Sequence, residues 1–135
     1  MGEFEGKLQM KDFCFPNISF KRKPKLSASM DLKIDIKACY KIINNKERTV
    51  IIRTEIADNQ KNIELEVDAQ ATFELVNADV LNEETQETLL NVNTIAIMMP
   101  YVRSQVALIT TQPGLTGIQI PIVDANIIAK HAQII

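Results

Sequence analysis

The chain has 135 residues, of which 46% are hydrophobic and 24% charged, and its formal net charge is -2 at pH 7. A chain of this length can bury a sizeable core, so we expect one domain over residues 1–135 that needs no disulfide or metal to fold. The composition excludes an intrinsically disordered protein. The small net charge excludes a general electrostatic attraction to nucleic acid.

The first residues and the longest apolar stretches bear on where the protein resides. Residues 1–11 alternate between charged and apolar side chains and lack the continuous apolar region of a signal peptide. No uninterrupted apolar run approaches the roughly 18 residues of a membrane-spanning helix. We therefore expect a cytoplasmic protein without membrane insertion. The one basic run, at 21–25, has no interleaved aromatic residues, and we interpret it as a solvated loop rather than a nucleic-acid contact.

Between residues 8 and 75 the apolar residues recur with a period of two, which indicates strands with one packed and one solvated face. We predict four strands, at about 8–15, 30–41, 49–56 and 63–75. Pro16 is expected to end the first strand. Clusters of turn-forming residues at 44–47 and 58–62 separate the later strands. Short turns between consecutive strands predict an antiparallel meander with the strands in chain order.

After Asn77 the apolar period changes to 3.6, which indicates helices. Asn82 is an N-cap candidate for a long helix, because acidic residues follow it in the first turn. Pro100 interrupts the helical pattern, so either one helix kinks there or two shorter helices meet. Asp124 is the N-cap candidate of a last helix. The predicted fold class is α+β: a four-stranded antiparallel sheet with a long, proline-containing helix and a C-terminal helix on one face.

The long helix and the segment after it carry more apolar side chains than one sheet face can cover. Six apolar residues lie off the main stripe of the helix and indicate a second contact layer, for which self-association is the simplest supplier: Leu90, Ile95, Ile97, Met98, Tyr101 and Leu108. The stretch at 115–123 is too apolar for an ordinary surface loop. It either lies in a groove or forms one.

The sequence offers no set of residues for catalysis. His131, the one histidine, has no carboxylate or thiol nearby, and we interpret it as a solvated helix residue. Cys14 and Cys39 lack metal-ligand spacing and are expected to be buried, reduced thiols. Gly114 and Gly117 do not form a phosphate-binding loop. We therefore expect a protein that is not an enzyme, with no catalytic residue, cofactor or metal site.

Three segments of the second half resemble one known family. Pro100-Tyr101-Val102-Arg103, Pro113-Gly114-Leu115 and residues 118–124 (IQIPIVD) resemble the helix, the connecting loop and the start of the final helix of the SecB export chaperones. Residues 11–15 look like the first-strand segment of that family, and Leu65-Glu66-Val67 looks like part of its last strand. The resemblance covers nearly the whole chain, but its specific part is 100–124.

The resemblance implies an ATP-independent chaperone, a holdase that binds non-native polypeptide in apolar grooves between the connecting loop and the sheet. It also implies a homotetramer, a dimer of dimers in which helices are sandwiched between two sheets. Carried over by position, the polypeptide-binding residues are Leu32, Ile34, Leu115, Ile118 and Ile120. Met98 and Met99 are expected to add adaptable side chains to the same binding site. The alternative is a structural, scaffolding oligomer in which the connecting loop packs against its own sheet and no client binds.

In export members of the family an acidic sheet surface binds the SecA motor, and the matching positions here are Asp12, Glu64 and Glu66. Glu64 stands where the family has an apolar residue, and Pro16 where it usually has an acidic one. The chain also ends at Ile135, without the polar tail that assists motor binding. Export and the protection of an antitoxin in a toxin–antitoxin pair therefore both stay open.

Overall fold

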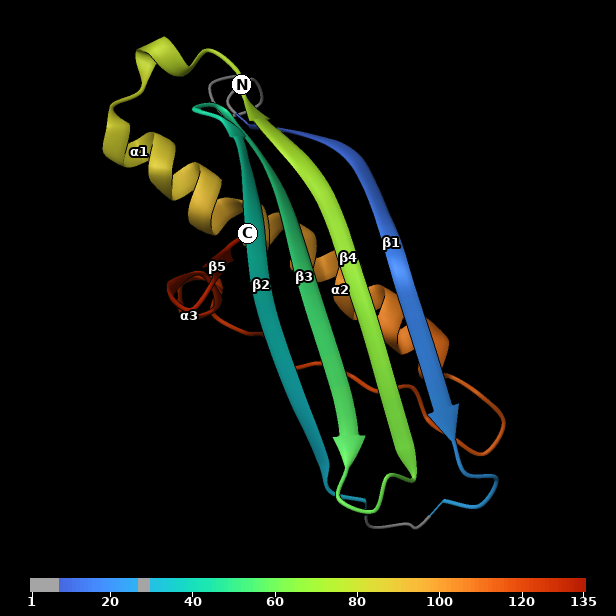
Figure 1. Cartoon of the computed structure of the whole chain (residues 1–135). Helices are drawn as coiled ribbons and strands as arrows, with labels where there is room; N and C mark the ends of the chain where they lie inside the picture. The colour runs from blue at the N-terminus through green and yellow to red at the C-terminus, as the bar shows by residue number, and fades with distance from the viewer. Residues whose placement is uncertain (1–7, 27–29) are drawn as a thin grey trace.

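In the computed structural model, which describes residues 8–26 and 30–135, one five-stranded sheet carries the helices on one of its faces (Figure 1). The elements are β1 (Leu8–Arg22), β2 (Leu32–Asn44), β3 (Glu47–Asp58), β4 (Ile63–Leu75), α1 (Glu83–Thr88), α2 (Thr94–Thr110), α3 (Ala125–Lys130) and β5 (Gln133–Ile134). The predicted α+β class is confirmed. The prediction that residues 1–11 are not a signal peptide concerns mostly residues 1–7, which lie outside the described residues.

The sheet order is β1-β4-β3-β2-β5. β2, β3 and β4 form the predicted antiparallel meander, but β1 pairs with β4 instead of β2, so the prediction that all four strands follow chain order is wrong. β1 ends beside the turn between β3 and β4, where the Lys23 N–H donates to the Asn62 carbonyl oxygen at 2.9 Å. The two-residue strand β5, which the sequence did not predict, runs parallel to β2 and pairs Gln133 with Cys39.

Pro16 lies inside β1, so the prediction that the strand ends there is wrong. Among the described strands β1 pairs only with β4, and the pairing register shifts between Lys11 and Cys14 and again between Cys14 and Asn17. A proline removes no ladder hydrogen bond at such an irregularity of an edge strand. Asp12 lies at the first shift and has a left-handed backbone conformation, with a φ of 54°.

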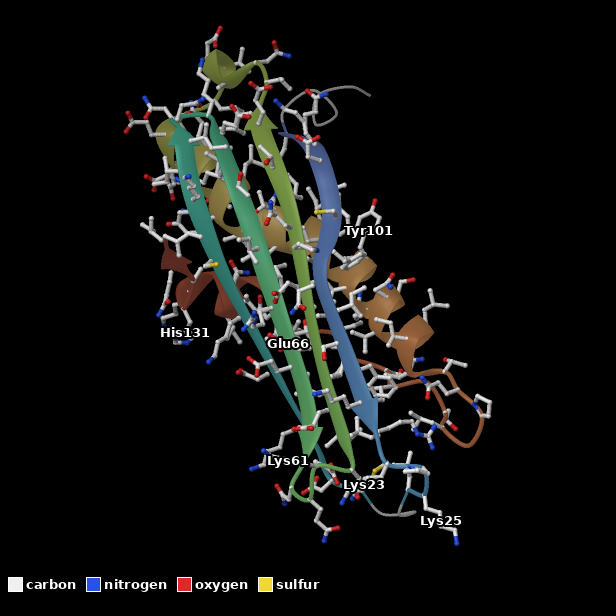
Figure 2. The ribbon with its side chains drawn as sticks, turned by 45° about the vertical axis from the view of Figure 1, so that its right-hand side comes forward. Lys23, Lys25, Lys61, Glu66, Tyr101 and His131 are labelled. Atoms are coloured by element: carbon white, nitrogen blue, oxygen red, sulfur yellow. The ribbon has the colours of Figure 1, made fainter. Side chains whose placement is uncertain are left out.

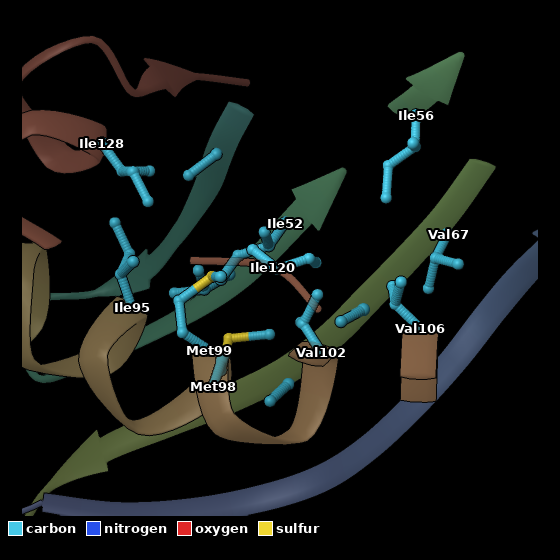
Figure 3. Close-up of a cluster of buried hydrophobic side chains, with 14 of the residues drawn as sticks. Ile52, Ile56, Val67, Ile95, Met98, Met99, Val102, Val106, Ile120 and Ile128 are labelled. Carbon is cyan, nitrogen blue, oxygen red and sulfur yellow. The ribbon is translucent and has the colours of Figure 1, made fainter. Parts of the chain in front are cut away.

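The core lies between the sheet and α2 (Figure 3). One stripe of α2, formed by Ile95, Met98, Val102 and Val106, is buried at helical spacing. The stripe belongs to one cluster with Ile52 and Ile56 of β3, Val67 of β4, Ile120 of the segment after α2 and Ile128 of α3. The alternate residues of β4 from Ile63 to Leu75 are all buried, which confirms the predicted packed face of that strand. Each large side chain so buried contributes roughly 1.5–3 kcal/mol.

The first and the last helix begin where the capping residues predict. The Asn82 side chain accepts a hydrogen bond from the Thr85 N–H at 2.7 Å, and Asp124 accepts one from the Asn126 N–H at 2.9 Å. α2 continues through Pro100 as one helix, and the change of winding lies upstream, in a π-helical segment at Leu89–Asn93. Pro100 is tolerated because it lies on the exposed side of α2.

The segment between α2 and α3, residues 111–124, is called the connector below, and Gly117 fixes its approach to α2. A Cβ atom at Gly117 would lie 2.5 Å from Thr111 Oγ1 and 3.1 Å from the Ala107 carbonyl oxygen. The Thr111 hydroxyl donates to that same carbonyl at 2.6 Å, so it cannot move aside without losing the hydrogen bond.

We expect Gly117→Ala to lower the free energy of unfolding by about 1–3 kcal/mol, because the added methyl group forces the connector away from α2. Urea denaturation followed by circular dichroism measures the change. The double substitution Gly117→Ala with Thr111→Ala should recover part of the loss, since it removes the closer of the two contacts. An unchanged denaturation midpoint in Gly117→Ala would contradict this account of the connector.

Candidate functional site

An apolar groove lies between β2 and the connector. Its first part, a hollow of about 540 Å³, is lined by Leu26, Met30, Leu32 and Ile34 on one side and by residues 114–119 on the other. Its second part, a hollow of about 340 Å³, continues along Ile34 and Ile36 and is closed by Ile120, Val123 and Ile127. Because Ile34 lines both hollows, they form one surface, called the β2 groove below, with a Leu26 end and an Ile127 end.

The groove exists because α2 packs on β3 and β4 and leaves the inner face of β2 at Leu32, Ile34 and Ile36 to the short α3 and the connector. The inner side chains of β3, such as Ile52 and Ile56, are therefore fully buried, whereas Leu32, Ile34 and Ile36 remain half-buried. Strict alternation along β2 directs these three apolar side chains to one face.

Two polar contacts fix the connector wall of the groove. The Arg22 guanidinium donates to the Pro113 carbonyl at 3.2 Å and to Gln112 Oε1 at 3.4 Å. The Thr110 hydroxyl accepts from the Ile118 N–H at 2.8 Å. The interpretation of residues 21–25 as a solvated loop is thus wrong for Arg22, which is half-buried, although the three lysines of that run are exposed.

The structure brings together five of the seven predicted polypeptide-binding residues, which are Leu32, Ile34, Leu115, Ile118 and Ile120. Ile118 and Ile120 are 8% and 5% exposed and form the floor, while Leu32, Ile34 and Leu115 are half-buried and form the walls.

The other two predicted residues, Met98 and Met99, line neither of the two hollows of the groove. Met98 is fully buried under the sheet, and Met99 lines a third hollow of about 290 Å³ with Pro100 and Ile122, which meets the second hollow at Val123 and Asp124. Both methionines follow the stripe of α2 that packs on the core, so neither adds surface to the groove.

Sequence reasoning did not single out Leu26, Met30 or Ile127, which also line the groove. Leu26 lies before the Ser-Ala-Ser segment at 27–29, outside any alternating pattern, so periodicity gave no signal for it. Met30 was predicted as the first apolar residue of the second strand, in phase with Leu32 and Ile34, but was not assigned to the groove. Arg22 was missed because its role depends on contacts with Gln112 and Pro113, which lie 90 and 91 residues further along the chain.

The three predicted docking acids lie on the other face of the sheet, and they are not gathered into one cluster. Glu64 and Glu66 neighbour each other on β4, opposite Lys21 and Ser19 of β1. Asp12 lies at the β1 irregularity near Gln70, which places it about 14 Å along the strand from Glu66 at roughly 3.4 Å per residue. Glu66, labelled in Figure 2, forms an ion pair with Arg53 at 2.9 Å.

Arg53 organises the centre of this outer face. Its Nε and Nη2 atoms donate to the two carboxylate oxygens of Asp68 at 2.8 Å and 3.0 Å, and Asn17 donates to the same carboxylate at 3.3 Å. Asp68 is buried. The hydrogen bonds from Arg53 hold the pKa of Asp68 below its usual value, with a further contribution from Asn17.

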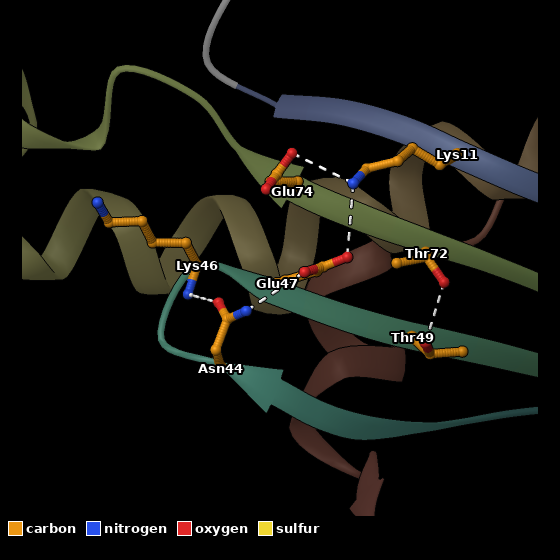
Figure 4. Close-up of polar contacts among 7 residues, drawn as sticks. All are labelled: Lys11, Asn44, Lys46, Glu47, Thr49, Thr72 and Glu74. Carbon is orange, nitrogen blue, oxygen red and sulfur yellow. Dashed lines mark hydrogen bonds and ion pairs between the residues drawn. The ribbon is translucent and has the colours of Figure 1, made fainter.

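A second polar cluster ties β1 to the rest of the sheet near the turn between β2 and β3 (Figure 4). Lys11 Nζ lies 3.2 Å from a Glu74 carboxylate oxygen and 3.5 Å from one of Glu47. The hydrogen bond with Glu74 raises the pKa of Lys11. The cluster is structural, because it joins three strands across the outer face.

The cysteines and the histidine do not form a site. In the described ranges no group of three or more His, Cys, Asp or Glu residues could hold a metal ion. Cys14 is exposed, which corrects the expectation of a buried thiol, and Cys39 is half-buried. The register shift of β1 places Cys14 on the outer face, in one cross-strand row with Gln70, Ile51 and Cys39. Three strand spacings, roughly 14 Å in total, separate the two thiols, which is too far for a disulfide.

His131 is exposed at the end of α3, as predicted (Figure 2). Within the part of the chain that the structure describes, no helix combines the length and the apolar character needed to cross a membrane.

Comparison with known proteins gives a match in structure only. No protein-family model and no curated protein sequence matches the chain. Among solved structures, the chain is similar to the SecB-like chaperone Rv1957 of Mycobacterium tuberculosis, solved in complex with a ChAD peptide from the HigA1 antitoxin Rv1956. The TM-score is 0.68 at 12% sequence identity, over 89% of this chain and 92% of that one. A protein of unknown function from Streptococcus agalactiae gives a TM-score of 0.40 at 10% identity, over 86% and 98% of the two chains, and this similarity carries no argument. The fold of this chain is SecB-like.

We expect acid to weaken the fold through Asp68. Its pKa is lower in the folded than in the unfolded chain, so the stability it gives is complete above the unfolded value, about 3.9, and is lost as the pH falls through the folded value. Asp68→Asn should cost about 1.5–3 kcal/mol at neutral pH, because the Arg53 hydrogen bonds lose their anionic partner. The difference from the wild type should shrink as the pH falls below the unfolded value and through the folded one.

Urea denaturation at a series of pH values measures this dependence. Asp35→Asn is the matched control, because Asp35 is exposed and its ion pair with Lys37 at 3.5 Å is open to solvent. A constant difference between the wild type and Asp68→Asn from neutral to acidic pH would contradict the assignment.

Proposed function

We propose that this protein, whose fold is SecB-like, is an ATP-independent chaperone that holds non-native polypeptide in the β2 groove. The observation that carries the proposal is the row of half-buried apolar side chains along β2, facing a connector wall that polar contacts hold in place. Burial of apolar client surface contributes roughly 25 cal/mol per Å², which requires neither nucleotide nor a fixed client sequence. We place this activity in the cytoplasm.

The backbone of β2 supports binding of an extended client. The Ile135 N–H donates to the Tyr40 carbonyl oxygen at 2.9 Å, so Tyr40 directs its backbone groups to the outer edge of β2. Alternation along a strand then directs those of Leu32, Ile34 and Ile36 to the same edge. In the described residues β5 is the one strand on this edge, and it pairs with Cys39 and Tyr40 alone. We propose that a client strand pairs with the edge in line with β5, while its side chains enter the groove.

The similar Mycobacterium tuberculosis structure contains an antitoxin peptide, which supports a dedicated client of this kind for the present protein. Protein export is the alternative role. The acidic residues proposed for motor docking, Asp12, Glu64 and Glu66, are spread over the outer face, and Arg53 binds Glu66. This arrangement favours the antitoxin role over export.

An apolar stripe on α2 supports self-association. Of the six residues expected to need a second contact layer, Leu90, Ile95 and Met98 are buried within the chain itself. The other three remain exposed: Ile97 by 37%, Tyr101 by 49% and Leu108 by 70%. Their spacing places them on one side of the helix. We propose that copies of the chain associate through this stripe, as a dimer of dimers.

In an aggregation assay we expect the wild type to suppress light scattering by a reduced, denatured model protein without ATP. Leu32→Ser with Leu115→Ser should require about tenfold more chaperone for the same effect, because two apolar contacts are lost. Val80→Ser is the matched control, since Val80 is 76% exposed and lies outside the groove. Unchanged aggregation at an excess of the wild-type protein would refute the proposal.

The client can be identified with the same wild-type protein as bait. Recovery of one short partner encoded beside the chaperone gene supports the dedicated role, and recovery of a SecA motor supports export.

The oligomer prediction uses Tyr101→Glu with Leu108→Glu. Charges on the α2 stripe should reduce the particle mass below that of the wild type, which we expect at about four times the 15.2 kDa of one chain. Size-exclusion chromatography with light scattering measures the mass, and circular dichroism checks the fold. Val80→Glu should not change the mass. A tetramer that binds no peptide would favour the scaffolding alternative.

A further inference from the structure

The two ends of the β2 groove differ in charge. Between residues 21 and 33 the sequence contains five basic residues and one acidic residue, Asp31. Arg22 is engaged with the connector, but Lys23 and Lys25 are exposed and form no ion pair among the described residues. These lysines are therefore available to a bound molecule.

The lysines are held at the Leu26 end of the groove. Lys25 precedes Leu26, which lines the groove, whereas Lys33 alternates with Leu32 and Ile34 and directs its side chain to the outer face of the sheet. Arg22 donates to the Pro24 carbonyl at 3.4 Å as well as to Pro113, which fixes the loop that carries Lys23 and Lys25 against the connector. Figure 2 shows Lys23 and Lys25 at the same end of the molecule.

The Ile127 end has the opposite sign. Asp124 lies at this hollow and accepts hydrogen bonds from the backbone and the side chain of Asn126. The Asp35 side chain alternates with Ile34 and Ile36 and pairs with Lys37 on the outer face, at 3.5 Å. The β2 groove is thus an apolar channel with cations at one end and a carboxylate at the other.

We infer that the client of this groove is an extended apolar segment flanked on one side by acidic residues, which lie at the Leu26 end against Lys23 and Lys25. The inference rests on the proposed function and specifies its client. Apolar contact supplies affinity but little selectivity, whereas opposite charges at the two ends of the groove attract one flank of the client and repel the other. A basic flank meets repulsion at the Leu26 end, and an acidic flank meets it at the Ile127 end. The charge difference therefore also sets the direction in which the segment lies.

The test compares labelled peptides with one apolar core and three flanks: serine, aspartate or lysine on one side of the core. Each is made with the flank before and after the core, because the strand direction is part of the question. Fluorescence anisotropy at about 50 mM salt, where the screening length is roughly 14 Å, should show the aspartate peptide in one order binding about threefold to tenfold more tightly than the serine peptide. The lysine peptide in that order should bind more weakly. The differences should shrink at about 300 mM salt.

Charge reversal at the Leu26 end of the groove provides the matched variants. Lys23→Glu with Lys25→Glu should reverse the order of the aspartate and lysine peptides while the serine peptide binds as before. Lys41→Glu with Lys46→Glu makes the same change in net charge near the turn between β2 and β3, away from the groove, and should leave the order unchanged.

The serine peptide separates the two proposals. If it binds, and binding is lost in Leu32→Ser with Leu115→Ser, the proposed function stands whatever the flanks do. Equal affinity for the aspartate and lysine peptides would then overturn the charge inference alone. If neither the serine nor the aspartate peptide binds at any flank order or salt concentration, the proposed function fails and the inference fails with it.

Discussion

The structure depends on the packing of α2 against β3 and β4. A helix with its side chains is about 10 Å across and strands are roughly 4.8 Å apart, so one helix covers about two strands of a sheet. The stripe from Ile95 to Val106 covers the two central strands, and the strands on either side must find other partners. β1 does so with aromatic rings: Phe13 packs on Phe15 at 5.1 Å and on Tyr101 of α2 at 5.0 Å between ring centroids. β2 has only α3 and the connector, which leave its apolar face half open.

This partial cover turns an ordinary sheet into a surface that can receive a polypeptide. A groove contributes to affinity only if its walls are in place before the client arrives, because ordering a loose loop consumes part of the binding energy. Here the connector is held from both sides, by Arg22 of β1 and by Thr110 at the end of α2. The close approach at Gly117 serves the same purpose. The contacts that stabilise the connector are therefore the ones that prepare the proposed site.

Local sequence patterns predicted the features that depend on residues close together in the sequence. The alternation from Ile63 to Leu75 showed the packed face of β4, and Asn82 and Asp124 marked helix starts through their own hydrogen bonds. The pairing of β1 with β4 joins residues about fifty positions apart and leaves no local signal. The register shifts that expose Cys14 and accommodate Pro16 are missed for the same reason. Met98 was assigned to the groove for its adaptable side chain, and a helix that is apolar around most of its girth does not reveal which stripe faces the core.

The same distinction explains how a SecB-like fold occurs at 12% identity to a structure it resembles over 89% of the chain. The fold requires alternation in the strands, one apolar stripe on α2 and a connector that fits against its end, and many combinations of apolar residues of suitable volume satisfy these conditions. The exposed residues at the mouths of the groove carry no such constraint. Lys23 and Lys25 can change without cost to the core, whereas Ile118 and Ile120 serve both the core and the groove floor. Under the proposed function, the fold therefore determines that the β2 groove holds an apolar segment. The charged residues at the two ends of the groove are the positions at which the choice of client can change.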